Sequence, residues 1–162
     1  MKINTKMKNY LDEFTTTALQ TDNCTVDLNT ITGIIFPDFF EWDGCVLLER
    51  GSENPLPPQF SPNQFIVDRT AFEADYNHVH LNDFFDEDFQ PSYLLKIGIK
   101  ILDVWAAFLY KKYNGNRRLI LILSFDGEEV VLRFYTAREN ELQWIDVTAI
   151  ESYLEGIIVA EI

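Results

Sequence analysis

His78 and His80 are the only histidines in the sequence, and they are two positions apart. On an extended segment both imidazole rings would point to the same side, with Asp75 and Asp83 near enough to complete a set of metal ligands. A metal held in this way would activate a water molecule, and the protein would then be a metal-dependent hydrolase. However, no lysine or arginine stands nearby to stabilise a developing oxyanion. We therefore favour a surface or hydrogen-bonded histidine pair, and we expect no metal, no cofactor and no catalytic residue.

Aromatic rings stand between carboxylates in two other segments, 38–43 and 83–89, which form our candidate partner-binding surface. The residues concerned are Asp38, Phe40, Glu41, Trp42 and Asp43 in the first segment, and Asp83, Phe84, Phe85, Asp86, Glu87 and Asp88 in the second. No lysine or arginine occurs in residues 9–49 or 70–95, so neither segment has a cation of its own. Clustered carboxylates repel one another, and a basic partner would relieve that repulsion while the rings serve as anchors. The alternative is that the rings belong to the core and the acids form a solvated rim.

The net charge of −13 is concentrated in residues 1–95, whereas the rest of the chain is close to balanced. Nucleic acid is not an expected partner, because phosphates require a basic surface. The four arginines of the last third, Arg117, Arg118, Arg133 and Arg138, form a modest basic group with glutamates interleaved. We expect these arginines to form cross-strand and turn pairs with nearby glutamates. Those glutamates are Glu128, Glu129, Glu139 and Glu141.

Two cysteines, Cys24 and Cys45, have no flanking positive charge that would lower a thiol pKa. We therefore expect both to be reduced and packed rather than nucleophilic. The first residues contain no apolar run of signal-peptide length, so the expected site of action is the cytoplasm.

The stretch from residue 91 to residue 113 carries the longest helical period in the sequence. Its apolar residues fall on two neighbouring stripes, and only a narrow polar strip is left for water. Pro91 suits the first helical position, while Lys111 and Lys112 suit the last turn. Charged residues interrupt the apolar run, so we do not expect it to span a membrane. We predict a long, buried central helix.

A β-hairpin is predicted over residues 117–135, because an Asp-Gly pair joins two apolar runs there. We expect one face of its second strand to pack on the long helix through Val130, Leu132 and Phe134. Residues 157–162 are predicted to form a closing strand, which could pair in either direction. Together these elements predict an α+β fold with a mostly antiparallel sheet packed by helices.

Weaker signals predict the remaining elements. An amphipathic helix is expected over residues 5–20, strands over 30–36, 44–50 and 64–69, and a short helix that begins with a Thr148–Glu151 capping box and stops at Gly156. The first two strands would form a hairpin. Four prolines mark a long loop over residues 51–63, which we place inside one domain, 1–162.

In its acidity, its aromatic-rich acidic segments and its terminal hairpin followed by a short helix, the chain resembles the immunity proteins of bacterial polymorphic-toxin and contact-dependent inhibition systems. Those proteins are small, acidic, non-enzymatic antitoxins that occlude the active site of a toxic domain, often a nuclease. The resemblance implies a cognate basic toxin domain as partner, bound by the acidic and aromatic surface. A small regulator that binds a basic host protein is an alternative.

Overall fold

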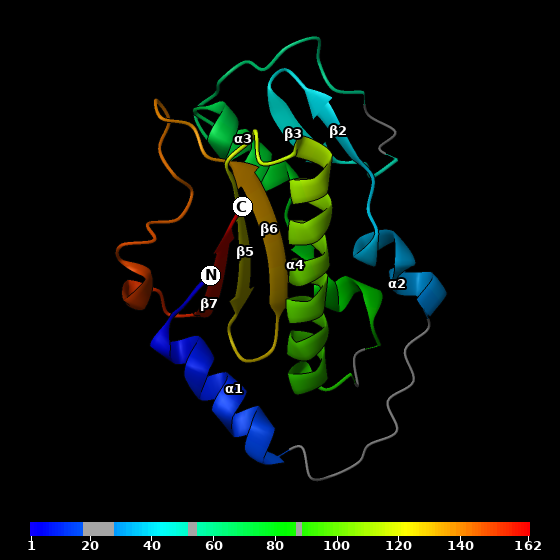
Figure 1. The fold of residues 1–162 in the computed structure, drawn as a ribbon, viewed down its shortest axis with the longest axis vertical. Helices are drawn as coiled ribbons and strands as arrows, with labels where there is room; N and C mark the ends of the chain where they lie inside the picture. The colour runs from blue at the N-terminus through cyan, green and yellow to red at the C-terminus, as the bar shows by residue number, and fades with distance from the viewer. Residues whose placement is uncertain (18–27, 52–54, 87–88) are drawn as a thin grey trace.

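An antiparallel sheet of five strands, in the order β1-β7-β5-β6-β4, forms the centre of the computed structural model, which describes residues 1–17, 28–51, 55–86 and 89–162. Its strands are β1 (Lys2–Ile3), β7 (Gly156–Glu161), β5 (Leu119–Phe125), β6 (Val130–Thr136) and β4 (Val79–His80). A two-stranded hairpin of β2 (Phe39–Trp42) and β3 (Cys45–Leu48) lies near one end of it (Figure 1). The helices are α1 (Thr5–Thr17), α2 (Leu28–Ile35), α3 (Arg69–Tyr76) and α4 (Pro91–Tyr113), with 3₁₀ turns η1 (Leu81–Phe84) and η2 (Ile150–Ser152). The predicted α+β class is confirmed.

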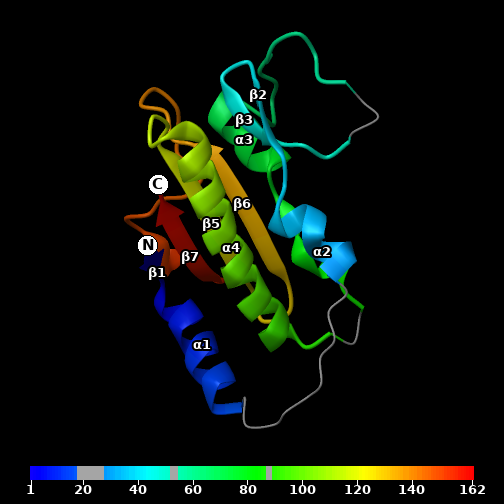
Figure 2. The same ribbon diagram turned by 45° about the vertical axis from the view of Figure 1, so that its right-hand side comes forward.

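The predicted long helix is confirmed as α4, which lies along one face of β5 and β6 (Figure 2). Pro91 stands at its start, where the missing N–H costs no hydrogen bond. Asn114 ends it in the left-handed conformation, with φ of 51°, as expected for a helix cap. None of the described helices, α4 included, is long and apolar enough to span a bilayer.

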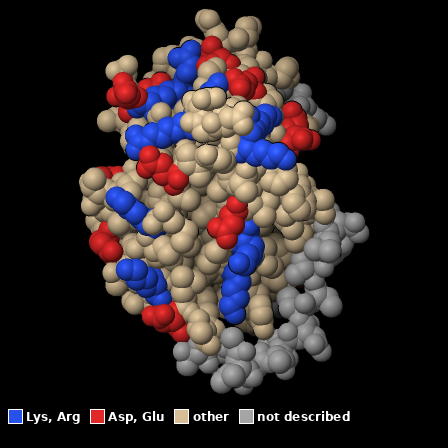
Figure 3. Space-filling view, in the orientation of Figure 1, with Lys and Arg blue, Asp and Glu red and all other residues tan. Residues whose placement is uncertain are grey.

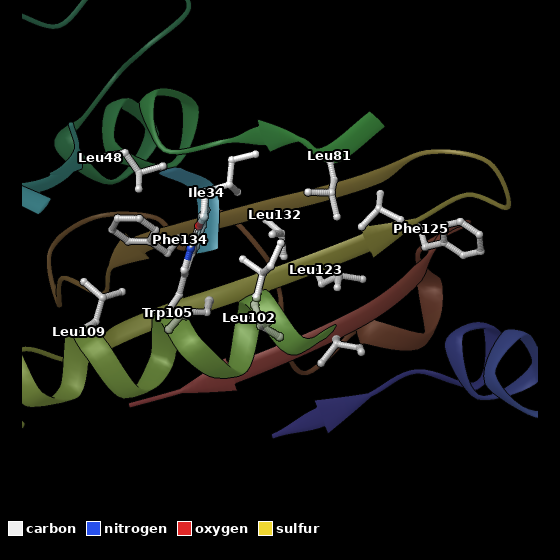
Figure 4. Close-up of a cluster of buried hydrophobic side chains, with 14 of the residues drawn as sticks. Ile34, Leu48, Leu81, Leu102, Trp105, Leu109, Leu123, Phe125, Leu132 and Phe134 are labelled. Atoms are coloured by element: carbon white, nitrogen blue, oxygen red, sulfur yellow. Dashed lines mark hydrogen bonds between the residues drawn. The ribbon is translucent and has the colours of Figure 1, made fainter. Parts of the chain in front are cut away.

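Close packing of α4 on the sheet builds the main core (Figure 4). Trp105 has no exposed surface, and its Nε1 donates a hydrogen bond to the carbonyl of Ile34 at 2.7 Å. That bond satisfies the indole N–H and ties α4 to α2. Gly98 faces the sheet where a Cβ atom would lie 2.8 Å from Val130 Cγ1, so the helix backbone approaches β6 at this point.

The β5–β6 hairpin pairs in antiparallel register, with Leu123 opposite Leu132. Val130, Leu132 and Phe134 are fully buried in the same cluster as the inner face of α4, which confirms the predicted face. Strand β7 pairs with the other edge of β5, also antiparallel, with Ile158 opposite Leu123. The parallel alternative for the closing strand is therefore wrong.

Asn4 fixes the amino terminus to the end of the chain. Its Oδ1 accepts hydrogen bonds from the backbone N–H groups of Met7 and Ile157, both at 2.9 Å, and its Nδ2 donates to the carbonyl of Glu155 at 2.8 Å. The side chain thus caps α1 and satisfies the start of β7 at once. The helix predicted over residues 5–20 is present as Thr5–Thr17, and residues 18–20 lie outside the described part.

Residues 137–155 cover part of the second face of the sheet through Ile145 and Ile150. The predicted capping box is wrong, because the Thr148 hydroxyl donates a hydrogen bond to Asp146 Oδ1 at 2.6 Å. Glu151 instead accepts the backbone N–H of Thr5 at 2.9 Å, a contact made by tertiary folding. Gly156 does not stop a helix but begins β7.

Two predicted strands are also wrong. The stretch 30–36 lies in and just after α2, whose apolar residues pack on α4. Helix α2 ends at Ile35, shortly before Pro37, because a proline disfavours helical backbone at the residue before it. The hairpin forms instead between β2 and β3, around Asp43 with φ of 46° and Gly44 with φ of 83°. An Asp-Gly pair suits that turn, because both central residues take positive φ. No strand forms over 64–69, where Asp68 Oδ1 caps α3.

Candidate functional site

A pocket of about 450 Å³ opens between α2, the end of β3, the β4–η1 segment and α4. Its lining combines apolar side chains, the fully buried Trp105 among them, with polar side chains. The lining residues are Gly33, Ile34, Pro37, Leu48, Glu49, Arg50, His78, Val79, His80, Asp83, Phe84 and Trp105. A hollow of this size with a few convergent polar groups is typical of a binding site.

Arg50 joins two sides of this pocket. Its Nη2 donates a hydrogen bond to the carbonyl of His78, and its guanidinium lies 5.8 Å from the centre of the Tyr76 ring. Partial burial lowers the pKa of Arg50, because desolvation disfavours the charged form, while Tyr76 and Asp75 oppose that effect. Sequence reasoning missed Arg50, since its partners are 26 to 28 positions away.

Strand β3 is positioned by helix α3, whose side chains take the place of a neighbouring strand. Asn77 Oδ1 accepts the N–H of Leu48 at 2.9 Å, and Asn77 Nδ2 donates to the carbonyls of Val46 at 2.8 Å and Phe134 at 3.3 Å. Glu73, one helical turn earlier, accepts the N–H of Val46 at 2.7 Å. Both side chains are fully buried. They satisfy the backbone of β3 and thereby fix where the pocket wall begins.

The first acidic segment is not free of counter-charge. Glu41 lies 2.6 Å from Arg117, and Asp43 lies 2.7 Å from Arg69. The backbone N–H of Phe60 and the Arg69 guanidinium both lower the pKa of Asp43 below its usual 3.8. The sequence showed no nearby cation because both arginines are supplied from outside the lysine- and arginine-free stretch. Only Asp38, of the carboxylates in this segment, forms no ion pair with a described residue.

The rings of the first segment are partly occupied within the protein. Phe40 is half-buried in β2. Trp42 is also half-buried, and its ring centre lies 5.0 Å from that of Phe72. Its Nε1 donates a hydrogen bond to the carbonyl of Pro57 at 2.9 Å. The contacts of Trp42 hold the hairpin against α3 and the loop at Pro57, and each of the two rings presents only part of its surface to a partner.

The second acidic segment borders the pocket directly. Asp83 is exposed, Phe84 is half-buried, and both line the pocket. Phe85 is half-buried against the core, with its ring centre 4.5 Å from that of Phe89, and Asp86 is exposed. The two remaining predicted site residues, Glu87 and Asp88, lie outside the described residues.

The pocket is lined by Asp83 and Phe84 of the second segment and by Pro37, the residue that precedes the first segment. No residue of segment 38–43 itself lines the pocket. The N–H of Glu49 donates to the backbone carbonyl of Asp38 at 2.8 Å, which ties the backbone of Asp38 to a residue that lines the pocket. Asp38, Asp83 and Asp86 form no side-chain ion pair or hydrogen bond within the described part of the chain. On the face in Figure 3, by contrast, acidic and basic side chains are interspersed over the atoms that are described.

The histidine pair lies at the pocket, but its nitrogen atoms are engaged by different partners. The two ring centres are 5.2 Å apart and nearly perpendicular. His78 Nδ1 contacts the carbonyl of Asp75, and His80 Nδ1 lies 2.5 Å from Glu129 Oε1. Over the described ranges, no three His, Cys, Asp or Glu side chains are grouped closely enough to hold a metal ion. The ligand set of the hydrolase alternative is therefore not assembled there.

The arginine pairs differ from the predicted ones. Arg118 pairs with Glu161 at 2.5 Å, and Arg138 lies 2.8 Å from Glu73. The one predicted pairing found is the turn contact between Arg138 and Glu141, at 3.8 Å. Register explains the difference, since the glutamates expected across the hairpin lie in its turn rather than opposite the arginines. Cys45 is a free, buried thiol whose pKa is raised to about 12, chiefly by burial. Cys24 lies outside the described residues.

Comparison with known proteins bears on the whole chain. A family model described as "Uncharacterized protein PM0498 family" matches residues 2–162. The chain belongs to this family. Searches among curated proteins and among solved structures each found no match. The family description names no activity.

Proposed function

We propose that this family member is a cytoplasmic immunity protein that binds a cognate basic toxin domain and occludes its active site. The observation that carries the proposal is the set of three carboxylates, Asp38, Asp83 and Asp86, that form no ion pair within the described residues, with Asp83 in the lining of the pocket. Carboxylates that no internal cation neutralises attract a basic surface, and they speed its association. The net charge of −13 acts in the same direction.

The pocket supplies the second component of such an interface. Phe84 and Val79 offer partly exposed apolar surface next to Asp83. Apolar contacts inside a polar rim are the usual anatomy of a protein interface, in which a few anchors provide most of the affinity. The protein then acts by binding alone and uses no cofactor. A regulator of a basic host protein would use the same surface, so partner identity distinguishes the two.

The test uses the full chain and, as the candidate toxin, the carboxyl-terminal domain of a large protein encoded directly upstream, where that domain is basic. Co-expression should restore the growth of cells that the toxin domain alone inhibits. The two purified proteins should co-elute in size-exclusion chromatography. Association should slow markedly when ionic strength rises from about 0.01 M to about 0.15 M, because exposed charges are screened. If growth stays inhibited on co-expression and the two proteins elute separately, the protein is not an immunity protein for that domain.

Charge reversal locates the surface. Asp83→Lys with Asp86→Lys should slow association by about tenfold or more at low salt. The matched control is Asp103→Lys with Glu139→Lys, which changes the net charge equally at exposed positions elsewhere. Equal slowing by both pairs would show that only net charge matters, and it would remove the pocket from the proposal.

A further inference from the structure

Arg133 lies in a second groove, on the face of the sheet opposite α4. This groove has a volume of about 630 Å³. Its floor comes from the sheet and its walls from residues 144–145 and 152–155. The lining residues are His80, Ile122, Ser124, Glu129, Val131, Arg133, Trp144, Ile145, Ser152, Tyr153, Leu154, Glu155 and Ile157. The proposed function does not use this groove.

The guanidinium of Arg133 has no hydrogen-bond acceptor in the described structure. Its Nη1 is buried without a partner, and no ion pair involves it within the described ranges. The guanidinium of Arg133 instead stacks on the ring of Trp144, whose centre lies 4.5 Å from the guanidinium carbon. Burial lowers the pKa of Arg133, while Asp75 and Glu155 act on it only from a distance. A guanidinium whose buried Nη1 hydrogens have no acceptor is costly, and an acceptor relieves that cost.

The surroundings of Arg133 define which acceptor fits. Trp144 is 44% exposed and Leu154 is 92% exposed, so the groove walls offer uncovered apolar surface. The hydroxyl of Ser124, half-buried on the floor, is a further polar group. Glu129 and Glu155 also line the groove and oppose a ligand with several negative charges. A single carboxylate paired with the guanidinium satisfies all of these conditions.

We propose that this groove binds a monocarboxylate with an apolar body, held by Arg133 and packed against Trp144. The carboxylate takes the unused N–H donors of the guanidinium, and the apolar body covers Trp144 and Leu154. The ligand can be a free small acid or the carboxyl terminus of a polypeptide, because the two share this chemistry.

The probe is phenylacetate, titrated into the full chain labelled with nitrogen-15. Saturable shifts are expected at the Trp144 indole N–H, which a Trp144→Phe variant assigns. Phenylacetamide, neutral and similar in shape, should bind at least about tenfold more weakly, as should the dianion phenyl phosphate. Equal binding of phenylacetate and phenylacetamide would overturn the proposal without any variant of the protein. Shifts that do not saturate would also overturn it.

Arg133→Met retains the aliphatic stem and should weaken phenylacetate binding by about tenfold or more. The control is Arg118→Met, whose exposed guanidinium pairs with Glu161 and should leave binding unchanged. If Arg133→Met fails to fold, Arg133→Lys retains the charge and should still lose affinity through loss of the two-pronged contact. If a folded Arg133 variant binds phenylacetate with unchanged affinity, Arg133 only stacks on Trp144, and the proposal is overturned.

The source of the carboxylate is distinguished by acetyl-leucyl-phenylalanine and its carboxyl-terminal amide. Tighter binding of the free dipeptide than of phenylacetate would indicate a polypeptide terminus, whereas weaker binding would indicate a small acid. Both results require that the amide binds less well than the acid, and the opposite order would contradict the proposal.

Discussion

Arg138 Nη1 lies 2.8 Å from Oε2 of Glu73, a carboxylate with no exposed surface. The Nη1 hydrogens are directed elsewhere, to Thr70 Oγ1 at 3.2 Å and the carbonyl of Thr136 at 3.0 Å. Oε2 therefore receives charge compensation without a direct hydrogen bond. The other oxygen, Oε1, accepts from Val46 and from the Thr136 hydroxyl, both at 2.7 Å. This ion pair joins α3, β3 and the end of β6.

Glu73→Gln should lower the free energy of unfolding by about 3 kcal/mol, because it leaves the Arg138 charge without its buried partner. Chemical denaturation measures the change. The double variant Glu73→Gln with Arg138→Met should cost less than the sum of the two single changes. Glu128→Gln, at an exposed position, is the control and should change stability little. Strict additivity of the two single changes would show that the pair is not coupled.

Asn77→Ala should destabilise the protein by about 2 to 3 kcal/mol, because the N–H of Leu48 and the carbonyl of Val46 would lose their buried partners. Hydrogen exchange at the Leu48 amide should accelerate more than exchange in the centre of β5. Asn140→Ala, at an exposed turn position, is the matched control. Unchanged protection at Leu48 would mean that other groups hold β3.

Two glycines should respond to alanine in opposite directions. Gly98→Ala should destabilise the protein by about 1 to 3 kcal/mol, because the new Cβ would lie 2.8 Å from Val130 Cγ1 and 3.1 Å from Leu123 Cδ1. Gly33→Ala, in α2 with nothing within 4 Å of the new atom, should stabilise it by about 0.5 to 1 kcal/mol. Thermal denaturation of both variants measures the contrast. Stabilisation by both changes would show that α4 can shift away from the sheet at no cost.

Asp43 should contribute to acid sensitivity. Its folded pKa is below the usual 3.8, so its contribution to stability is complete well above pH 3.8 and is lost as the pH falls below that value toward the folded pKa. Asparagine tolerates the positive φ at this position. Asp43→Asn should therefore make the free energy of unfolding less dependent on pH between about pH 5 and pH 2, and the number of protons taken up on unfolding should fall by up to one. Asp38→Asn, which removes a carboxylate that forms no ion pair in the described structure, is the matched control. A slope that is identical in Asp43→Asn and in the original protein would contradict this account.

Local signals predicted the elements that organise the fold. The helical period over residues 91–113 and the Asp-Gly pair before Val130 act through near neighbours, so the sequence alone revealed them. The same Asp-Gly rule applied to Asp43-Gly44 would have placed the first strand of the hairpin at β2, in place of the wrong strand over 30–36. Short apolar runs such as 30–36 do not distinguish helix from strand, and packing against α4 decided in favour of helix.

Residue types and spacing determined that this protein has an α+β fold, a buried central helix and an acidic first half. The tertiary structure alone decided which acids are neutralised, because the ion pairs join distant positions. Asp43 and Arg69 are 26 positions apart, and Glu41 and Arg117 are 76 positions apart. Charge along a chain can be counted from the sequence, but charge on a surface depends on which side chains folding brings within a few ångströms of each other. For the same reason, only the structure separated Asp38 from its paired neighbours Glu41 and Asp43 and showed Arg133 without an acceptor among the described residues.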